Sequence, residues 1–415
     1  MRQMTQILMT MFLTISLFST VSAADWNQWK GPNRDGKSTE TGLNTDWSKQ
    51  LPKLLWTAEG LGNGFSNLSF FNDKMFTMGD FNEKTYIIAL NREDAKLLWK
   101  TEIGIGGMPG GYGIGPKCTP TTDGNYVYAL SQNGVIACVD FETGKLIWKK
   151  DFIKDFNGKM MSQWGFAESP LLDDDWIICC PGSEQNGTMF ALDKKTGNVV
   201  WKTKELTNPA SYASVSVINI DGVRQYLIIT DKILAGINCQ DGSLLWKVDF
   251  PGRVAVCTDP VYDDHIVFVT CAYGVGSYAY SIKKQGNQFV AKEIYNVREV
   301  DNKHHGLILD NGFIYSTTDK GALSCVEMKN GKMKWQNRRL RAVSDLAFAD
   351  GHLILRTEKS GELILVEANP EKYVEKGRFQ QPDRTDQNAW TYPLILDGKL
   401  FIRDQDKLFC YDLSK

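Results

Sequence analysis

The sequence lacks a surplus of charge of either sign. Its 415 residues include 47 basic and 49 acidic side chains, so the formal net charge is −2. Proteins whose main partner is a nucleic acid or an anionic membrane ordinarily carry a basic surface. The composition therefore gives no electrostatic reason to expect DNA, RNA or an anionic membrane as the main partner.

Histidine and the common catalytic motifs are also scarce. The chain has only four histidines and contains neither an HExxH sequence nor a nucleophile elbow. Its aspartate-rich turns are short and lack the spacing of a calcium loop. No metal site is predicted from these patterns.

Long apolar runs are missing except at the start of the chain, where Ile7 to Phe18 follows the positive Arg2. Small residues at 21–23 offer a cleavage site, so residues 1–23 are predicted to be a signal peptide. A single membrane anchor is the alternative, but the run is short for a bilayer span. We expect an exported protein, periplasmic or extracellular, whose mature chain begins at Ala24 and has no transmembrane span.

A repeated turn dominates the rest of the sequence. A glycine stands four residues before a tryptophan, and a small or acidic residue stands four places before the glycine. The copies are Asp140–Gly144–Trp148, Asp193–Gly197–Trp201, Asn238–Gly242–Trp246 and Glu327–Gly331–Trp335, with Asn91–Ala95–Trp99 as a variant. Self-similarity at a period of 40 to 50 residues predicts a repeat architecture.

The number of repeats is predicted to be eight. Eight strands end in turns at residues 72–73, 123–124, 173–174, 221–222, 263–264, 311–312, 350–351 and 397–398. The tryptophan position is filled at Trp56, Trp99, Trp148, Trp201, Trp246 and Trp335, and degenerate copies are expected near Val290 and Glu375. Both counts agree on eight units of four strands.

The two ends of the chain predict a closed ring. Strands at 400–402 and 408–412 begin a unit that stops before its last strand, while 52–56 is a last strand without a unit ahead of it. Joining them completes a sheet and protects strand edges. We therefore predict an all-β, eight-bladed β-propeller of four-stranded antiparallel blades over 51–415, preceded by an N-terminal extension, 24–50. An open solenoid is the alternative.

Nine cysteines in an exported chain would ordinarily suggest disulfides. Cys138 and Cys325 each lie ten residues before a repeat tryptophan, and Cys410 takes the matching place in the last unit. Cysteines at the same position of different repeats lie in separate blades, so they are not expected to form disulfides with one another. The odd total also leaves at least one thiol unpaired. We expect small buried core residues.

The pattern Ala-x-Asp-x-x-Thr-Gly-x-x-x-Trp resembles the pyrroloquinoline-quinone-type repeat. It is complete from Ala191 to Trp201 and recurs from Ala137 to Trp148 with one additional residue. Quinoprotein alcohol dehydrogenases and the outer-membrane barrel-assembly lipoprotein, factor B, share this repeat. Residues 26–36 are also similar to the opening of many secreted bacterial members, some named polyvinyl-alcohol dehydrogenase-like. The resemblance covers nearly all of the mature chain.

For a dehydrogenase, the resemblance implies a calcium ion held by carboxylate and amide groups, a catalytic aspartate, an arginine on the quinone and a stacking tryptophan. A vicinal disulfide covers the quinone in several members, and Cys179–Cys180 is similar to that element. The pair follows Trp176 and precedes Pro181, as the end of a blade strand would. Because a vicinal ring needs a strained backbone, unlinked core thiols are the preferred interpretation.

The loops that enter the innermost strands are expected to form one mouth of the central channel. They carry aromatic and cationic candidates for ligand binding: Tyr112, Trp164, Tyr212, Arg253, His304, His305, Arg341 and Trp390. Such a ring can stack a planar anionic quinone or hold an acidic peptide or sugar. It can equally plug the channel. Adjacent histidines on a strand point to opposite faces, so at most one would face the channel, as a metal ligand, a proton-transfer base or a packed histidine.

Two other features are weaker. The glycine-rich stretch from Gly104 to Gly115 precedes Pro116 and a strand, so it is expected to be a loop between blades rather than a phosphate cradle. A carbohydrate-active enzyme would need two carboxylates facing the channel, for which Asp404 and Glu168 are the nearest candidates.

The sequence thus favours an exported binding scaffold that presents its channel mouth to a protein or saccharide partner, without a predicted cofactor. The alternative is a dehydrogenase that uses pyrroloquinoline quinone and calcium to oxidise an alcohol or a sugar. The repeat is specific for the fold rather than for the activity, because function resides in sites carried by a fold.

Overall fold

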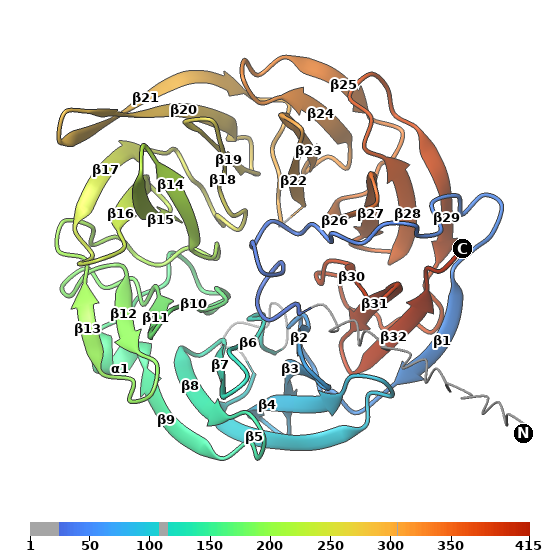
Figure 1. The fold of residues 1–415 in the computed structure, drawn as a ribbon, viewed down its shortest axis with the longest axis horizontal. Coiled ribbons are helices and arrows are strands. Elements are labelled where there is room, and N and C mark those ends of the chain that lie inside the picture. Colours follow the sequence, from blue (N-terminus) through green and yellow to red (C-terminus); the bar gives the residue numbers. More distant parts are fainter. Residues whose placement is uncertain (1–24, 108–114, 305) are drawn as a thin grey trace, which may run out of the picture.

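The computed structural model describes residues 25–107, 115–304 and 306–415. Eight four-stranded antiparallel sheets are arranged as the blades of a ring (Figure 1). The predicted eight-bladed propeller is therefore confirmed. The signal peptide, Tyr112 and His305 lie outside the described residues.

The blades follow chain order, and each is listed from its innermost strand. Blade 1 contains β2 (Ser69–Phe71), β3 (Lys74–Phe81), β4 (Lys84–Asn91) and β5 (Leu97–Ile105). Blade 2 contains β6 (Thr121–Thr122), β7 (Tyr126–Leu130), β8 (Val135–Asp140) and β9 (Leu146–Asp151). Blade 3 contains β10 (Leu171–Asp173), β11 (Trp176–Cys179), β12 (Phe190–Asp193) and β13 (Val199–Lys202). Blade 4 contains β14 (Ser216–Ile220), β15 (Val223–Ile229), β16 (Ile233–Asn238) and β17 (Leu244–Asp249).

The second half of the ring repeats this order. Blade 5 contains β18 (Val261–Asp263), β19 (Ile266–Cys271), β20 (Gly276–Gln285) and β21 (Gln288–Val297). Blade 6 contains β22 (Leu307–Asp310), β23 (Phe313–Thr317), β24 (Leu323–Glu327) and β25 (Met333–Asn337). Blade 7 contains β26 (Ser344–Ala349), β27 (His352–Thr357), β28 (Glu362–Glu367) and β29 (Glu375–Gln380). Blade 8 contains β30 (Leu394–Leu396), β31 (Lys399–Asp404), β32 (Lys407–Asp412) and β1 (Lys53–Ala58).

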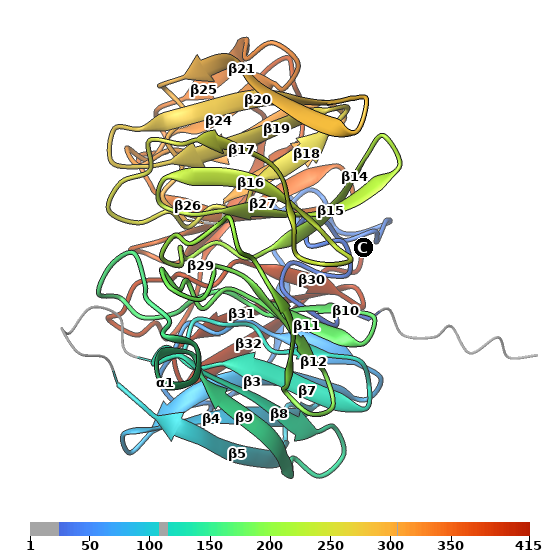
Figure 2. The ribbon, with the colours of Figure 1, turned by 90° about the vertical axis from the view of Figure 1, so that its left-hand side faces the viewer.

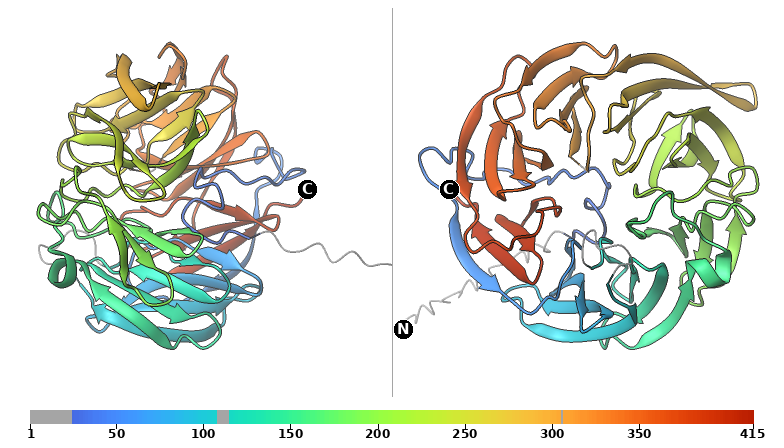
Figure 3. Two further views of the ribbon diagram at one scale, coloured as in Figure 1. Left: turned by 60° about the vertical axis from the view of Figure 1, so that its left-hand side comes forward. Right: turned by 180° about the vertical axis from the view of Figure 1, so that it is seen from behind.

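Blade 8 closes the ring in the way that the sequence predicts. Strand β1 pairs antiparallel with β32, so that Leu54 lies opposite Tyr411 and Trp56 opposite Cys410. The two views in Figure 3 show β1 beside the C-terminal strands from an oblique angle and from behind. The chain ends thus share one sheet, which leaves no gap between the first and last blades.

The repeated glycine has a steric cause. The turn glycine of one blade packs against the tryptophan of the preceding blade: a Cβ on Gly242 would lie 2.3 Å from Cε3 of Trp201, and a Cβ on Gly197 2.8 Å from Cδ2 of Trp148. The Trp148 indole Nε1 also donates to the carbonyl of Lys194, at 3.0 Å. Blades 2, 3 and 4 therefore each contact the preceding blade through a glycine–tryptophan pair.

A matched pair of substitutions separates this contact from backbone strain. Gly242 (φ +73°) and Gly222 (φ +79°) are both in the left-handed region, but a Cβ on Gly222 would meet no atom within 4 Å. We expect Gly222→Ala to lower the free energy of unfolding by about 1 kcal/mol and Gly242→Ala by about 2 to 4 kcal/mol, because only the second also overpacks a neighbour. Denaturant unfolding measures both. Equal losses would show that Trp201 does not constrain the turn.

The two degenerate positions predicted near Val290 and Glu375 need correction. In blade 5 the place of the tryptophan is taken by Tyr295, whose ring lies 2.5 Å from a Cβ built on Gly331. In blade 7 it is taken by Gly377, where a Cβ would lie 2.7 Å from Cβ of Trp47. The same β-bulge stands beside the retained Trp148 and Trp201, so it was the replacement of the tryptophan that hid the register in the sequence.

The cysteine prediction is confirmed for the repeated position. Cys138 lies opposite Trp148 and Cys325 opposite Trp335, as Cys410 lies opposite Trp56. All nine cysteines are free, and all except Cys257 are fully buried. The thiols fill space between strands of separate blades.

Residues 25–50 cross one face of the ring (Figures 1 and 2). In the side view this segment lies opposite the helix α1 (Phe152–Phe156). Short bridges attach it to the inner strands, pairing Trp26 with Phe70 and Lys37 with Phe348. Among the described residues, no helix is long and apolar enough to cross a membrane.

Candidate functional site

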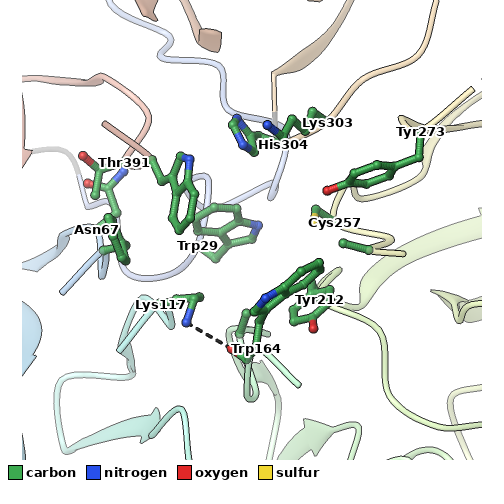
Figure 4. A pocket seen from close by; sticks show the side chains of 14 residues that line it. Trp29, Asn67, Lys117, Trp164, Tyr212, Cys257, Tyr273, Lys303, His304 and Thr391 are labelled. Atoms are coloured by element: carbon green, nitrogen blue, oxygen red, sulfur yellow. Dashed lines mark hydrogen bonds between the residues drawn. The ribbon is translucent and has the colours of Figure 1, made fainter. Parts of the chain in front are cut away.

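A cavity of about 250 Å³ lies where the loops between blades converge near the ring axis (Figure 4). Each such loop runs from the outermost strand of one blade to the innermost strand of the next, as predicted for the channel mouth. The cavity is lined by Trp29, Phe65, Asn67, Lys117, Trp164, Ala167, Tyr212, Ala255, Cys257, Tyr273, Lys303, His304, Trp390 and Thr391. Four of the predicted residues, Trp164, Tyr212, His304 and Trp390, are therefore brought together.

Aromatic rings form most of the cavity wall. The ring centroids of Trp164 and Tyr212 are 6.1 Å apart, and those of Phe65 and Trp390 are 4.7 Å apart. The His304 imidazole lies 5.9 Å from the Trp390 ring. Such rings bury a large apolar area with little conformational entropy to lose, which suits recognition of an apolar group.

The N-terminal segment supplies the floor. Trp29 donates its indole N–H to Oδ2 of Asp259 at 2.7 Å and packs edge-on against Tyr392, with 5.0 Å between ring centroids. The next residue, Lys30, places Nζ 3.3 Å from the same Asp259 oxygen. Sequence reasoning treated this segment as an extension and missed Trp29. The two closely spaced tryptophans Trp26 and Trp29 were the signal that could have indicated burial.

Arg34 fixes the same segment to blade 3. Its guanidinium donates to the carbonyl of Ser169 at 2.8 Å and to Oε1 of Gln28 at 3.1 Å. Burial lowers the pKa of Arg34 to about 10, while the charge of Asp259 opposes this shift. The N-terminal segment thus fills the channel from one face and is held there by buried polar contacts. Its Trp29 forms the floor of the cavity.

Glu358 organises the wall on the side of blade 7. It is 6 % exposed, accepts a hydrogen bond from Nε1 of Trp390 at 2.8 Å, and lies 3.6 Å from Nε2 of His304. Nζ of Lys303 is 3.7 Å from the same oxygen. His304 is therefore a packed histidine beside a carboxylate. Among the described residues, no group of three or more histidine, cysteine, aspartate or glutamate side chains is placed to hold a metal.

Lys117 is the second cation of the cavity, and sequence reasoning missed it. Its Nζ donates to the carbonyl of Trp164 at 3.2 Å (Figure 4). Burial lowers the pKa of Lys117 to about 8, against the opposing attraction of Asp80. The ammonium therefore loses its charge more easily than an exposed lysine does.

This shift predicts a pH dependence of stability. The pKa of Lys117 is about 8 in the fold and 10.5 as the ordinary value, so the unfolded chain binds more protons between these limits. The contribution of this group to stability should rise as the pH increases from about 8 to about 10.5. Denaturant unfolding of the wild type and Lys117→Met at several pH values measures it. A difference between the two that does not change with pH would contradict the shift.

A shallower groove of about 570 Å³ adjoins the cavity and shares Trp164 with it. Arg253, another predicted residue, lines this groove together with Asp231 and Lys232. We call the cavity and the groove together the mouth. Arg341, in the loop between β25 and β26, is not among the residues that line either hollow.

The residues of the cavity do not match the calcium and quinone set implied by the resemblance. Calcium takes six or more oxygen ligands. The described lining residues include one amide, Asn67, and no carboxylate. The Asn67 amide is already committed, donating to the carbonyl of Tyr392 and accepting from the N–H of Leu68.

The other dehydrogenase and glycosidase candidates lie away from the cavity. Cys179 and Cys180 are buried, unlinked thiols in and after β11, and the N–H of Cys180 donates to Glu168 at 2.6 Å. Burial raises the pKa of Glu168 to about 7. Asp404 is buried and accepts from Gln381 and Thr385. Neither carboxylate lines the mouth.

A closed ring of eight four-stranded blades, with glycine–tryptophan contacts that recur between neighbouring blades, defines an eight-bladed β-propeller. The family model described as outer membrane protein assembly factor BamB matches residues 83–337. Because the match spans more than half of the chain, the chain belongs to this family.

Individual relatives agree with the family. The chain is 23% identical over 318 residues to the outer membrane protein assembly factor BamB of Yersinia pestis, covering 74% of this chain and 76% of that one. It is 21% identical over 281 residues to the protein of the same name from Moranella endobia (strain PCIT), covering 64% and 68%.

Solved structures with low identity support the fold alone. The chain superposes on BamB from Moraxella catarrhalis with a TM-score of 0.60 and 12% identity, covering 87% of this chain and 97% of that one. A europium-containing methanol dehydrogenase gives a TM-score of 0.65, also at 12% identity, covering 91% and 89%. The same architecture thus serves an assembly factor and an enzyme.

Proposed function

We propose that this protein is an exported scaffold of the BamB family that binds a partner protein at its mouth. The observation that carries the proposal is the convergence of the loops between blades on an aromatic cavity whose floor is closed by Trp29. A hollow with rigid aromatic walls and a polar rim has the anatomy of a protein-binding hot spot. The name shared by the relatives favours a protein over a saccharide as the partner.

Export is part of the proposal and rests on the predicted signal peptide, residues 1–23. The names of the relatives refer to the outer membrane, which agrees with a location in the cell envelope. Expression of the full chain should yield a mature protein beginning at Ala24, as read by mass spectrometry of the intact protein. An uncleaved N-terminus would contradict it.

Site-specific photo-crosslinking tests where the partner binds. A photoreactive residue in place of Arg253 probes the mouth, and the same residue in place of Asp174 probes the opposite end of blade 3, in an exposed turn. We expect a discrete adduct from position 253 only, and we expect Trp164→Ala to abolish it. Equal adducts at both positions, or an adduct at position 174 alone, would refute the mouth as the docking site.

The alternative function has a direct test. The purified protein is mixed with pyrroloquinoline quinone and calcium, and its absorbance and dye reduction with alcohols and sugars are followed. We expect neither a stoichiometric shift of quinone absorbance nor turnover, because the cavity lining supplies no carboxylate ligands. Tight binding with turnover would establish a dehydrogenase instead.

A further inference from the structure

The mouth is basic, although the chain as a whole is slightly acidic. Its described lining contains four cationic side chains, Lys117, Lys232, Arg253 and Lys303, in addition to His304. The only carboxylate in that lining is Asp231. The formal net charge of the whole chain is −2. This local excess of positive charge points to an acidic ligand.

Lys232 donates its hydrogen bond to a neutral group, and Asp231 is the only carboxylate beside it in the described lining of the groove. Nζ of Lys232 donates to the carbonyl of Gly252 at 2.9 Å, and a carbonyl is a neutral acceptor. Lys303 faces Glu358 at 3.7 Å, but that carboxylate also accepts from the Trp390 indole. The groove and its border with the cavity therefore keep cationic groups that a partner's carboxylates can approach.

The cavity itself favours binding of an apolar group of the ligand. Its volume of about 250 Å³ is of the size of a single large side chain, and its walls are mostly indole, phenol and phenyl rings. Interfaces obtain much of their affinity from one such anchor seated in a desolvated pocket and surrounded by a polar rim. The cavity provides the pocket, and the cations provide the rim.

A saccharide would be poorly satisfied here. The hydroxyls of a sugar ring need acceptors, and a buried hydroxyl without one is costly. The Asn67 oxygen already accepts from Leu68, and Glu358 already accepts from Trp390. Apart from the hydroxyl groups of Tyr212, Tyr273 and Thr391, the described lining offers a ligand mainly apolar surface and ammonium donors.

We propose that the partner protein inserts one aromatic side chain into the cavity and places flanking carboxylates against the cations of the groove. The inference rests on the proposed function and specifies its partner: an acidic segment with an aromatic anchor. Trp164, which borders both hollows, contacts the anchor, while Arg253 and Lys232 contact the carboxylates. The acidic groups accelerate docking and make it salt-dependent, and the anchor provides most of the residence time.

Calorimetric titration with capped synthetic peptides tests this arrangement. The first peptide carries one phenylalanine flanked by two glutamates on each side, the second replaces the glutamates with glutamines, and the third replaces the phenylalanine with alanine. We expect saturable binding of the first peptide at low salt, and about tenfold weaker binding of each of the others.

Variants assign the two contributions. Arg253→Gln should reduce the preference for glutamate over glutamine to about threefold, while Lys283→Gln, on the distant β20–β21 hairpin, should leave it unchanged. Trp164→Phe should retain the preference for phenylalanine over alanine, and Trp164→Ala should remove it.

Three outcomes would overturn the inference: equal affinity for the glutamate and glutamine peptides, no saturable binding of any peptide, or tighter binding of a hexuronate oligosaccharide. If a crosslinked adduct forms at position 253 but one of these outcomes is also found, the proposal that the partner docks at the mouth stands. Only the inference that the partner offers an acidic segment with an aromatic anchor is then refuted. If no adduct forms at position 253 but the peptides keep the expected order of affinities, the proposal that the natural partner docks at the mouth is refuted instead.

Discussion

Replacing Arg403 with methionine is expected to lower the free energy of unfolding by about 3 to 5 kcal/mol, because several buried carbonyls lose their donor at once. Arg403 is 1 % exposed and extends from β31 of blade 8 into blade 1. Its guanidinium donates to the carbonyls of Ser66 and Met78, at 2.9 and 2.5 Å, and to those of Leu61 and Gly62, at 3.3 and 3.2 Å.

The position of this residue explains the size of the effect. Ring closure depends on blade 8, whose strands come from both ends of the chain, and Arg403 joins that blade to the next. Arg356 occupies the equivalent place in blade 7, where it donates to Gln381 at 2.7 Å and to the carbonyl of Arg403 at 2.5 Å. Two successive blades thus use a buried guanidinium as their interblade contact.

Denaturant unfolding measures the loss, with Arg298→Met as the control at an exposed site. That control is expected to stay within about 0.5 kcal/mol of the wild type. Arg403→Lys should also destabilise the protein, because one ammonium group cannot reproduce the planar fork of donors. A variant Arg403→Met as stable as its control would show that the carbonyls find other donors or water.

The second large effect is expected for Asp259→Asn, which should release the N-terminal segment from the channel. The carboxylate accepts from the Trp29 indole and from the N–H of Ser214, both at 2.7 Å, and it faces the buried Lys30 at 3.3 Å. Removing one partner of a buried ion pair leaves an uncompensated charge and costs about 3 to 5 kcal/mol. We therefore expect residues 25–36 to exchange amide hydrogens faster and to be cut by protease.

The control for this change is Glu102→Gln, which breaks an exposed ion pair with Lys84. Exposed pairs contribute about 0 to 1 kcal/mol, so protection of residues 25–36 should be unchanged. Because Trp29 forms the floor of the cavity, Asp259→Asn should also weaken binding at the mouth. Full protection of the segment in Asp259→Asn would show that Arg34 and Trp26 hold it without the carboxylate.

Much of the fold could be predicted because the repeat is a local pattern with a recurring contact. A glycine with positive φ and the tryptophan packed against it recur at Gly197 and Gly242, so each copy reports the same contact between neighbouring blades. The prediction failed where a different residue fills the same place, as Tyr295 and Gly377 do. The glycine–tryptophan spacing reveals the tryptophan position of a blade only where a tryptophan still occupies it.

The candidate site could be predicted only as a region. Topology placed the connecting loops at one mouth, and Trp164, Tyr212, His304 and Trp390 do meet there, with Arg253 beside them. Arg341 lines neither hollow, and the sequence analysis did not single out the lysines of the mouth. Loop side chains have no periodicity, so their directions follow from packing that the sequence does not display.

The sequence by itself determined the number of blades, the closure of the ring and the burial of the repeat cysteines, because these depend on short, repeated spacings. Only the tertiary structure decided that residues 25–36 enter the channel, that Asp259 holds Trp29 there, and that Arg403 joins blade 8 to blade 1. These contacts join residues far apart in the chain; among the described residues, those of the N-terminal segment occur once, and the buried arginine recurs only as Arg356 of blade 7. A single long-range contact leaves no periodic trace, and its partners become visible only when the ring brings them together.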